Sequence, residues 1–264
     1  MKTTISSILF LLSVALLNIS VLCGSEQQQQ QQQQHVSAIV SVEAVKLLQE
    51  GNARFIAGAP QHSHSDMKRV WETAEHGQHP FVTILGCSDS RVPFTVIFDQ
   101  GIGDIFSVQA AGNVSGPAQL GSIEYGVAHA GTRLVVVLGH TKCGAITTAC
   151  TNGGHEGHIE YLIQKINPAV RQSQLATGKS GNEIIELTCQ TNVFLQIEAL
   201  KMESKILSNA VERGELIIIG AIYDIDTGKV EFLETPHQVI KTVKRELPRL
   251  LYPAQRKWEF RTNR

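Results

Sequence analysis

Three side chains that bind transition metals lie in the middle of the chain: Cys87, His140 and Cys143. Thiolate sulfur and imidazole nitrogen are ligands that suit zinc. A structural zinc site is closed by four protein ligands, whereas a catalytic site uses three and keeps the fourth position for water or substrate. Two cysteines and one histidine therefore predict a catalytic Zn²⁺ ion, one per chain.

A carboxylate and a guanidinium follow the first cysteine within residues 87–91, which read Cys-Ser-Asp-Ser-Arg. Asp89 and Arg91 are spaced to form a bidentate ion pair, which would hold the carboxylate as an oriented hydrogen-bond acceptor. Released from Arg91, Asp89 could instead reach the metal and close the site. A plain structural ion pair is the competing interpretation, but the position beside Cys87 favours a catalytic role.

The elements that must position these residues are predicted to be strands of a buried parallel sheet. Continuous apolar runs of this kind are typical of strands covered on both faces. Cys87 follows the first run and His140 follows the third, so both lie at carboxyl ends of strands, where α/β sheets bind ligands. The three runs are residues 81–86, 104–108 and 134–139.

Helical patterns between and around these runs complete the expected fold. Their alternation with the strands predicts an α/β fold with a mainly parallel central β-sheet flanked by helices. A buried strand is expected at 216–223, followed by a turn and a hairpin strand at 229–233. The expected helices are residues 41–54, 119–130, 159–174 and 193–213.

The first 40 residues read as export and tether segments. A basic Lys2 and an apolar core at 8–17 are typical of a signal peptide, and this core is short for a membrane span of ~20 residues. We therefore expect a signal peptide at 1–24, export to the periplasm or outside the cell, and no stable membrane insertion. Acylation of Cys23 is the open alternative. A glutamine-rich disordered tether (25–40), the catalytic domain (41–250) and a C-terminal tail (251–264) follow.

Composition limits the classes of partner. The chain has 264 residues, 42% of them hydrophobic, and a formal net charge of −1, so there is no general attraction to nucleic acid. Of the five cysteines, Cys150 and Cys189 are not assigned to the metal. They could form a disulfide in an exported protein, but nothing in the sequence brings them together, so we expect buried thiols.

Two segments carry a family resemblance: residues 87–93, Cys-Ser-Asp-Ser-Arg-Val-Pro, and residues 139–145, Gly-His-Thr-Lys-Cys-Gly-Ala. They resemble the signature segments of the β-class carbonic anhydrases. The resemblance extends over residues 42–223 and implies the fold of that family, including an N-terminal helical arm. Further blocks similar in order and spacing are residues 51–55, 103–106, 111–114 and 121–127.

The resemblance implies zinc-dependent, reversible hydration of carbon dioxide to bicarbonate and a proton. It implies that Asp89 accepts a hydrogen bond from the reacting hydroxide and that Arg91 fixes Asp89. Gln78 matches the family's substrate-binding glutamine. Phe106 and Tyr125 match the apolar wall of the substrate pocket, with Tyr125 contributed across a dimer interface.

The resemblance also implies a homodimer or tetramer, in which the helix at 41–50 reaches over a neighbouring subunit. Members with an inhibitory bicarbonate site resemble one another in a tryptophan and an arginine at the places of Ile84 and Gln109. We therefore expect no such site and an Asp89 paired to Arg91 near neutral pH.

Two other functions remain open. The same zinc ligands would serve a carbon disulfide or carbonyl sulfide hydrolase on the same scaffold. A catalytically silent, zinc-stabilised scaffold protein is the non-enzymatic alternative, against which the joint presence of Gln78, Asp89 and Arg91 argues, because a purely structural site needs none of them.

Overall fold

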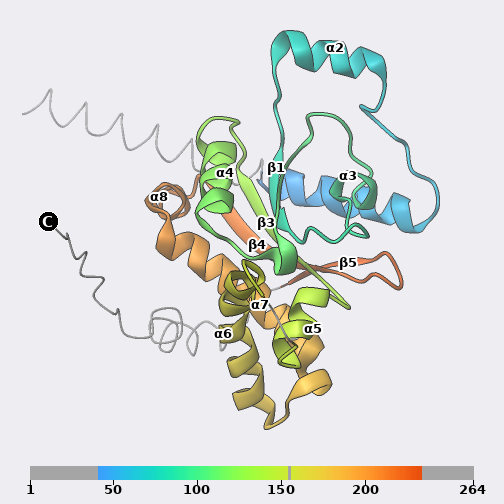
Figure 1. Cartoon of the computed structure of the whole chain (residues 1–264). Helices are drawn as coiled ribbons and strands as arrows, with labels where there is room; N and C mark the ends of the chain where they lie inside the picture. The colour runs from blue at the N-terminus through green and yellow to red at the C-terminus, as the bar shows by residue number, and fades with distance from the viewer. Residues whose placement is uncertain (1–40, 154–155, 234–264) are drawn as a thin grey trace, which may run out of the picture.

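A five-stranded sheet lies between helices in the computed structural model, which describes residues 41–153 and 156–233 (Figure 1). The strand order is β2-β1-β3-β4-β5, with parallel pairing throughout except for the antiparallel pair β4–β5. The expected mainly parallel sheet and the final hairpin strand are confirmed. The strands are β1 (Val82–Gly86), β2 (Ile105–Gln109), β3 (Leu134–His140), β4 (Ile217–Tyr223) and β5 (Val230–Leu233).

The two central strands form the core of the molecule, because every residue of β1 and β3 is buried. Val82 and Ile84 face one hydrophobic cluster, whereas Leu85 faces the other, as expected for side chains that alternate across a sheet. Residues 41–56, which are helical, and α3 (Phe94–Ile97) cover the first face. Helices α4 (Pro117–Ala128), α7 (Ile185–Glu203) and α8 (Lys205–Glu212) cover the second.

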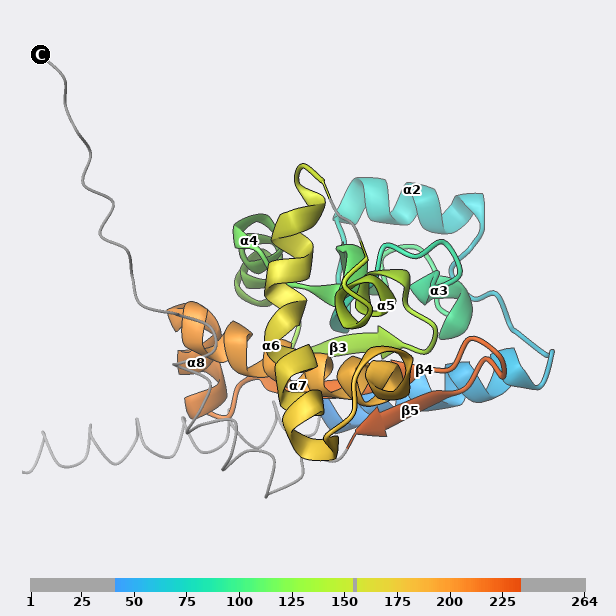
Figure 2. The same cartoon turned by 60° about the horizontal axis from the view of Figure 1, so that its bottom comes forward.

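A third layer lies at the carboxyl end of the parallel strands. Helix α5 (Gly144–Cys150) begins just after β3 and packs with α6 (Ile159–Thr177), as Figure 2 shows. The short 3₁₀ turns η1 (Ala111–Asn113) and η2 (Gly181–Ile184) belong to the same layer. These elements enclose the turns that carry the predicted metal ligands.

The helix expected over 193–213 is two helices. The break falls at Ser204, whose extended backbone (φ −119°, ψ 115°) ends α7 and caps α8, with Oγ accepting from the amide of Leu207. Ser204 Oγ also donates to Glu124 Oε1 on α4, at 2.6 Å. The break is therefore fixed by a contact with a distant helix.

A helix that was not expected from the sequence precedes β1. Helix α2 (Met67–His76) occupies a segment for which the sequence predicted no helix. Asp66 is its N-cap and accepts from the amide of Arg69, which is the capping signal that identifies this start.

The entrance helix packs on its own chain. Ala44 and Leu48 are buried in the first cluster against the sheet of the same chain. The expected reach of its first ten residues over a neighbouring subunit stays a prediction. Ser41 Oγ donates to the carbonyl of Arg133, which also ties the helix to its own sheet. The opposite side, with Val42 and Leu47, is exposed.

Several expectations fall outside the described residues. The signal peptide, Cys23, the tether and the C-terminal tail lie there, so export and the domain limits stay predictions. Among the described helices, none is long and apolar enough to cross a bilayer. The expected thiols are confirmed, because Cys150 and Cys189 are both free and buried.

Candidate metal centre

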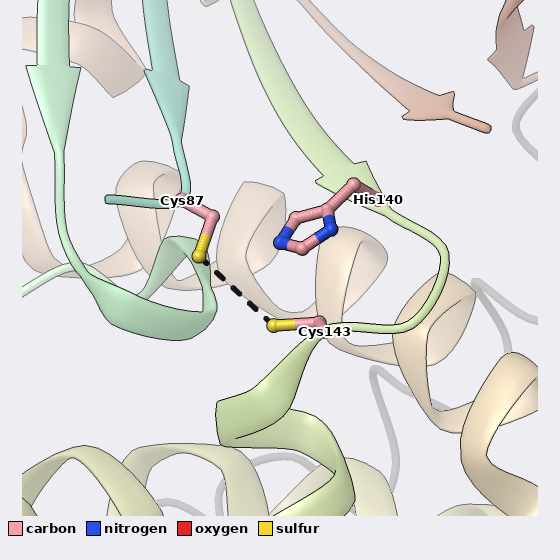
Figure 3. A group of neighbouring side chains, drawn as sticks. All are labelled: Cys87, His140 and Cys143. Carbon is pink, nitrogen blue, oxygen red and sulfur yellow. Dashed lines mark hydrogen bonds between the residues drawn. The ribbon is translucent and has the colours of Figure 1, made fainter. Parts of the chain in front are cut away.

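The three predicted ligands converge at the carboxyl ends of β1 and β3 (Figure 3). Cys87 directly follows β1, His140 is the last residue of β3, and Cys143 is the N-cap of α5. One ligand atom from each lies within 4.8 Å of the others, and the two sulfurs are 4.0 Å apart. All three residues are buried, at 4%, 0% and 1% exposure, so the site is enclosed by the core.

The imidazole of His140 is oriented by a hydrogen bond to the backbone of the next residue. Nδ1 lies 2.9 Å from the carbonyl oxygen of Thr141; because a carbonyl can only accept, Nδ1 carries the proton. This leaves Nε2 with a free lone pair. Nε2 is fully buried and has no hydrogen-bond partner among the described residues. A buried acceptor without a partner is costly unless a cation occupies the space beside it.

A tight turn between His140 and Cys143 brings the second sulfur back toward the first. Lys142 adopts a left-handed conformation (φ 56°) at this turn. Thr141 anchors it, because its amide donates to the carbonyl of Tyr223 and its hydroxyl accepts from the amide of Ile225. The last strand pair thus sets where Cys143 points.

The two thiols share a hydrogen bond that prepares Cys87 as a thiolate. The bond with Cys143 is the main cause that lowers the pKa of Cys87, against the opposing effect of burial. The amide of Gly112 contributes in the same direction, from 3.3 Å. The same shared bond, together with burial, raises the pKa of Cys143. A cation that binds both sulfurs must therefore displace the proton of Cys143.

These donors fit zinc. Two buried thiols and an imidazole whose buried Nε2 has no hydrogen-bond partner form a three-ligand set of the kind that catalytic zinc sites use. Within the described residues no other cluster of this kind is present. The expectation of zinc bound by Cys87, His140 and Cys143 therefore agrees with the geometry.

The predicted Asp89–Arg91 pair is present beside the ligands. Arg91 Nε and Nη2 donate to the two carboxylate oxygens at 2.9 and 2.7 Å, and the amide of Arg91 adds a third bond at 3.0 Å. These bonds hold the pKa of Asp89 at about 2. Asp89 Oδ2 lies 4.0 Å from His140 Nε2, so the ionised carboxylate borders the metal pocket.

The three residues expected to bind substrate form no hydrogen bond, ion pair or ring contact with the metal ligands among the described residues. Phe106 on β2 and Tyr125 on α4 stack with ring centroids 6.1 Å apart, and Tyr125 is 54% exposed. Gln78 lies in the exposed segment before β1. Among the described residues, no hydrogen bond, ion pair or ring contact joins these three to Cys87 or Asp89, so their substrate roles stay predictions.

Ile84 and Gln109 stand where members with an inhibitory bicarbonate site resemble one another in a tryptophan and an arginine. In this chain both residues have structural contacts. Ile84 is fully buried in the first hydrophobic cluster. Gln109 Nε2 donates to the carbonyl of Cys87 at 3.1 Å, so it supports the first ligand through the backbone. The absence of an inhibitory bicarbonate site remains a prediction.

The sequence did not reveal the side chains of α7 that donate hydrogen bonds to the backbone at and near the metal ligands. Cys189 Sγ donates to the carbonyl of His140 at 3.1 Å, and Asn192 Nδ2 donates to the carbonyl of Gly112 at 2.9 Å. Both come from α7. The block Ala111-Gly112-Asn113 was recognised as a family block, but no spacing in the sequence indicated that its amide reaches a sulfur.

Comparison with known proteins agrees with the geometry. The family model described as carbonic anhydrase matches residues 82–230. The chain is 38% identical to carbonic anhydrase 2 of Mycobacterium tuberculosis (strain CDC 1551 / Oshkosh) over 192 residues, which cover 71% of this chain and 90% of that protein. It is 35% identical to a carbonic anhydrase of Mycolicibacterium smegmatis over 194 residues, which cover 72% and 92%.

A solved structure extends the likeness to three dimensions. The β-carbonic anhydrase of the fungal pathogen Aspergillus fumigatus superposes with a TM-score of 0.56 at 29% identity, covering 68% of this chain and 93% of that one. The metal-binding residues Cys87, His140 and Cys143 all lie within the matched residues. On the sequence match, the shared fold and the ligand geometry together, this chain belongs to the β-class carbonic anhydrase family.

Proposed function

We propose that the chain catalyses the reversible hydration of carbon dioxide to bicarbonate and a proton, using zinc held by Cys87, His140 and Cys143. The observation that carries this proposal is the buried, unsatisfied Nε2 of His140, which faces two sulfurs and lies 4.0 Å from an arginine-held carboxylate. A structural zinc site has no need of that carboxylate. The named relatives of M. tuberculosis and M. smegmatis are carbonic anhydrases.

In the proposed reaction, Asp89 and Arg91 have separate roles beside the metal. When bound, zinc supplies hydroxide near neutral pH, because it lowers the pKa of water toward ~7. Asp89 is ionised at neutral pH and so can only accept hydrogen bonds; it orients the hydroxyl hydrogen of the reacting water or bicarbonate. Arg91 keeps Asp89 from rotating by holding both of its oxygens. The proton leaves to solvent or buffer.

We propose in addition that the active form is a homodimer or tetramer. Strand β2 forms one edge of the sheet, and Phe106 on it stacks with the exposed Tyr125. An exposed tyrosine stacked on a half-buried phenylalanine beside an open strand edge is a typical contact surface for another subunit. A second copy seated there would bring Tyr125 to the neighbour's substrate pocket.

Stopped-flow measurement of carbon dioxide hydration, with zinc content measured on the same sample, tests the proposed reaction. Asp89→Ala should lower the rate by about 100-fold while zinc stays bound, because a positioned proton acceptor is worth at least that much. Asp226→Ala is the matched control: Asp226 pairs with Lys142 beside the same turn but is 59% exposed. That variant should keep the wild-type rate.

Two results would contradict the proposal. One is a wild-type chain without stoichiometric zinc. The other is an Asp89→Ala variant as fast as Asp226→Ala, which would point to a zinc-stabilised scaffold. Turnover of carbon disulfide but not of carbon dioxide would favour the hydrolase alternative on the same ligands.

A further inference from the structure

Helix α7 presents a row of buried polar side chains to the metal centre. Asn192 and Gln196 are 0% and 3% exposed, and their spacing of four places them on one face of the helix. Gln196 Nε2 donates to Asn192 Oδ1 at 3.3 Å, which leaves Asn192 Nδ2 free to donate elsewhere. Gln196 Oε1 accepts from the amide and hydroxyl of Ser115, at 2.9 and 3.0 Å. The row therefore contacts the loop that follows β2.

At the other end of this row, Asn192 is linked to the metal ligand Cys87 through hydrogen bonds to one intermediate residue, Gly112. Asn192 Nδ2 donates to the carbonyl of Gly112 at 2.9 Å, and the amide of the same Gly112 donates to Cys87 Sγ at 3.3 Å. Gly112 is left-handed (φ +70°), and a Cβ there would lie 2.7 Å from Ile166 Cδ1. Glycine is thus required, and glycine does not fix its own backbone angles. The angles must be fixed from outside.

We propose that Asn192 is a positioning residue for the zinc ligand Cys87: it holds Gly112 so that the Gly112 amide donates to Cys87 Sγ. The inference rests on the proposed function only in that Cys87 binds zinc. This support comes from a segment distant in the sequence, because Asn192 is 80 residues from Gly112. Partners of metal ligands commonly set ligand orientation and metal affinity.

The expected effect follows from the chain of hydrogen bonds. Without the Asn192 amide, the Gly112 carbonyl loses its partner and the loop is free to turn its amide away from the sulfur. A thiolate that loses an N–H donor becomes more electron-rich. In a Co²⁺-substituted protein, the sulfur-to-cobalt charge-transfer band should then move to longer wavelength. Zinc affinity should fall by about tenfold, the lower end for loss of such a partner.

The test compares Asn192→Leu with Thr191→Val on purified full-length protein. Thr191 is the matched control, because it is also buried on α7. Its hydroxyl donates to the carbonyl of Leu187 and accepts from Ser173 Oγ on α6, and neither bond involves Gly112 or a metal ligand. Zinc affinity is measured by competition with a chromophoric chelator, and the Co²⁺ spectrum is recorded for each protein. Asn192→Leu should show weaker zinc binding and the shifted band, whereas Thr191→Val should match wild type in both.

The outcomes separate this inference from the proposed function. If wild type binds zinc and Asn192→Leu keeps both its affinity and its cobalt spectrum, Asn192 has no positioning role. If both variants change equally, the effect is general loss of packing and the inference is again wrong. Should Asn192→Leu fail to fold, Gln196→Met decides: a smaller shift in the same direction supports the inference, and an unchanged spectrum overturns it. Absence of zinc from wild type would instead contradict the proposed function.

Discussion

The metal centre and the predicted substrate wall differ in how completely one chain builds them. Cys87, His140 and Cys143 are at most 4% exposed, and each takes part in at least one backbone or side-chain hydrogen bond. Tyr125 is 54% exposed and its described ring contacts are with Phe106 and His129. A single chain therefore completes the ligand set but leaves the wall open to solvent.

This difference follows from what each part must do. Ligands must be fixed closely, and burial among strand ends with satisfied hydrogen bonds achieves this. An apolar wall needs only to exclude water, and a neighbouring subunit can supply it. The comparison predicts that substitutions at the centre change metal binding and chemistry, whereas substitutions at the wall change assembly first.

The largest effect on zinc content and hydration rate is expected from substitution of a metal ligand. Cys143→Ala should remove zinc and lower hydration by more than about 100-fold, because loss of an outer partner alone already costs about 10–100-fold. Cys150→Ala is the matched control, since Cys150 is a buried free thiol on the same helix. Metal analysis and stopped-flow rates check both. Equal zinc content in the two variants would show that Cys143 is not a ligand.

A smaller effect is expected at the wall. Tyr125→Ala should weaken subunit association by about 2 kcal/mol, roughly a 30-fold rise in Kd, as for a central aromatic side chain of an interface. Tyr161→Ala removes a comparably exposed tyrosine (43%) from α6 and should leave assembly unchanged. Sedimentation velocity over a dilution series measures both. The interface would lie elsewhere if the two variants dissociated alike.

The smallest effect on the hydration rate is expected at Asp99, which anchors the segment leading to α2. Burial favours a raised pKa there, but hydrogen bonds from the amides of Gln61 and His62 and from Arg54 outweigh it and lower the pKa. The ionised carboxylate therefore adds stability above its unfolded pKa of ~3.9, and this is lost as pH falls through the lower folded value.

Asp99→Asn should accordingly cost about 2 kcal/mol of unfolding free energy at pH 7, as for hydrogen bonds to a charged group, with little change in hydration rate. Urea unfolding of variant and wild type at pH 7 and at about pH 3 measures the gap, which should narrow at the lower pH. A gap that stays constant with pH would mean that the charge of Asp99 does not stabilise the fold.

The sequence alone determined the chemistry and the scaffold. Cys87 and His140 follow apolar runs, and those runs become β1 and β3 with every residue buried. Asp89 and Arg91 pair as their spacing predicts, because both lie in one short turn. These features depend on residues that are close in the chain, so local patterns are enough to find them.

Tertiary structure decided what local patterns cannot encode. The break at Ser204 depends on Glu124, and the support of Cys87 by Gly112 depends on Asn192; both partners are 80 residues away. The packing of the entrance helix on its own sheet is of the same kind. Such contacts form only when the sheet brings distant segments together, and many pairings of polar residues are equally compatible with the sequence. The ligands can therefore be predicted from their spacing in the sequence, whereas the groups that support them are determined by the tertiary structure.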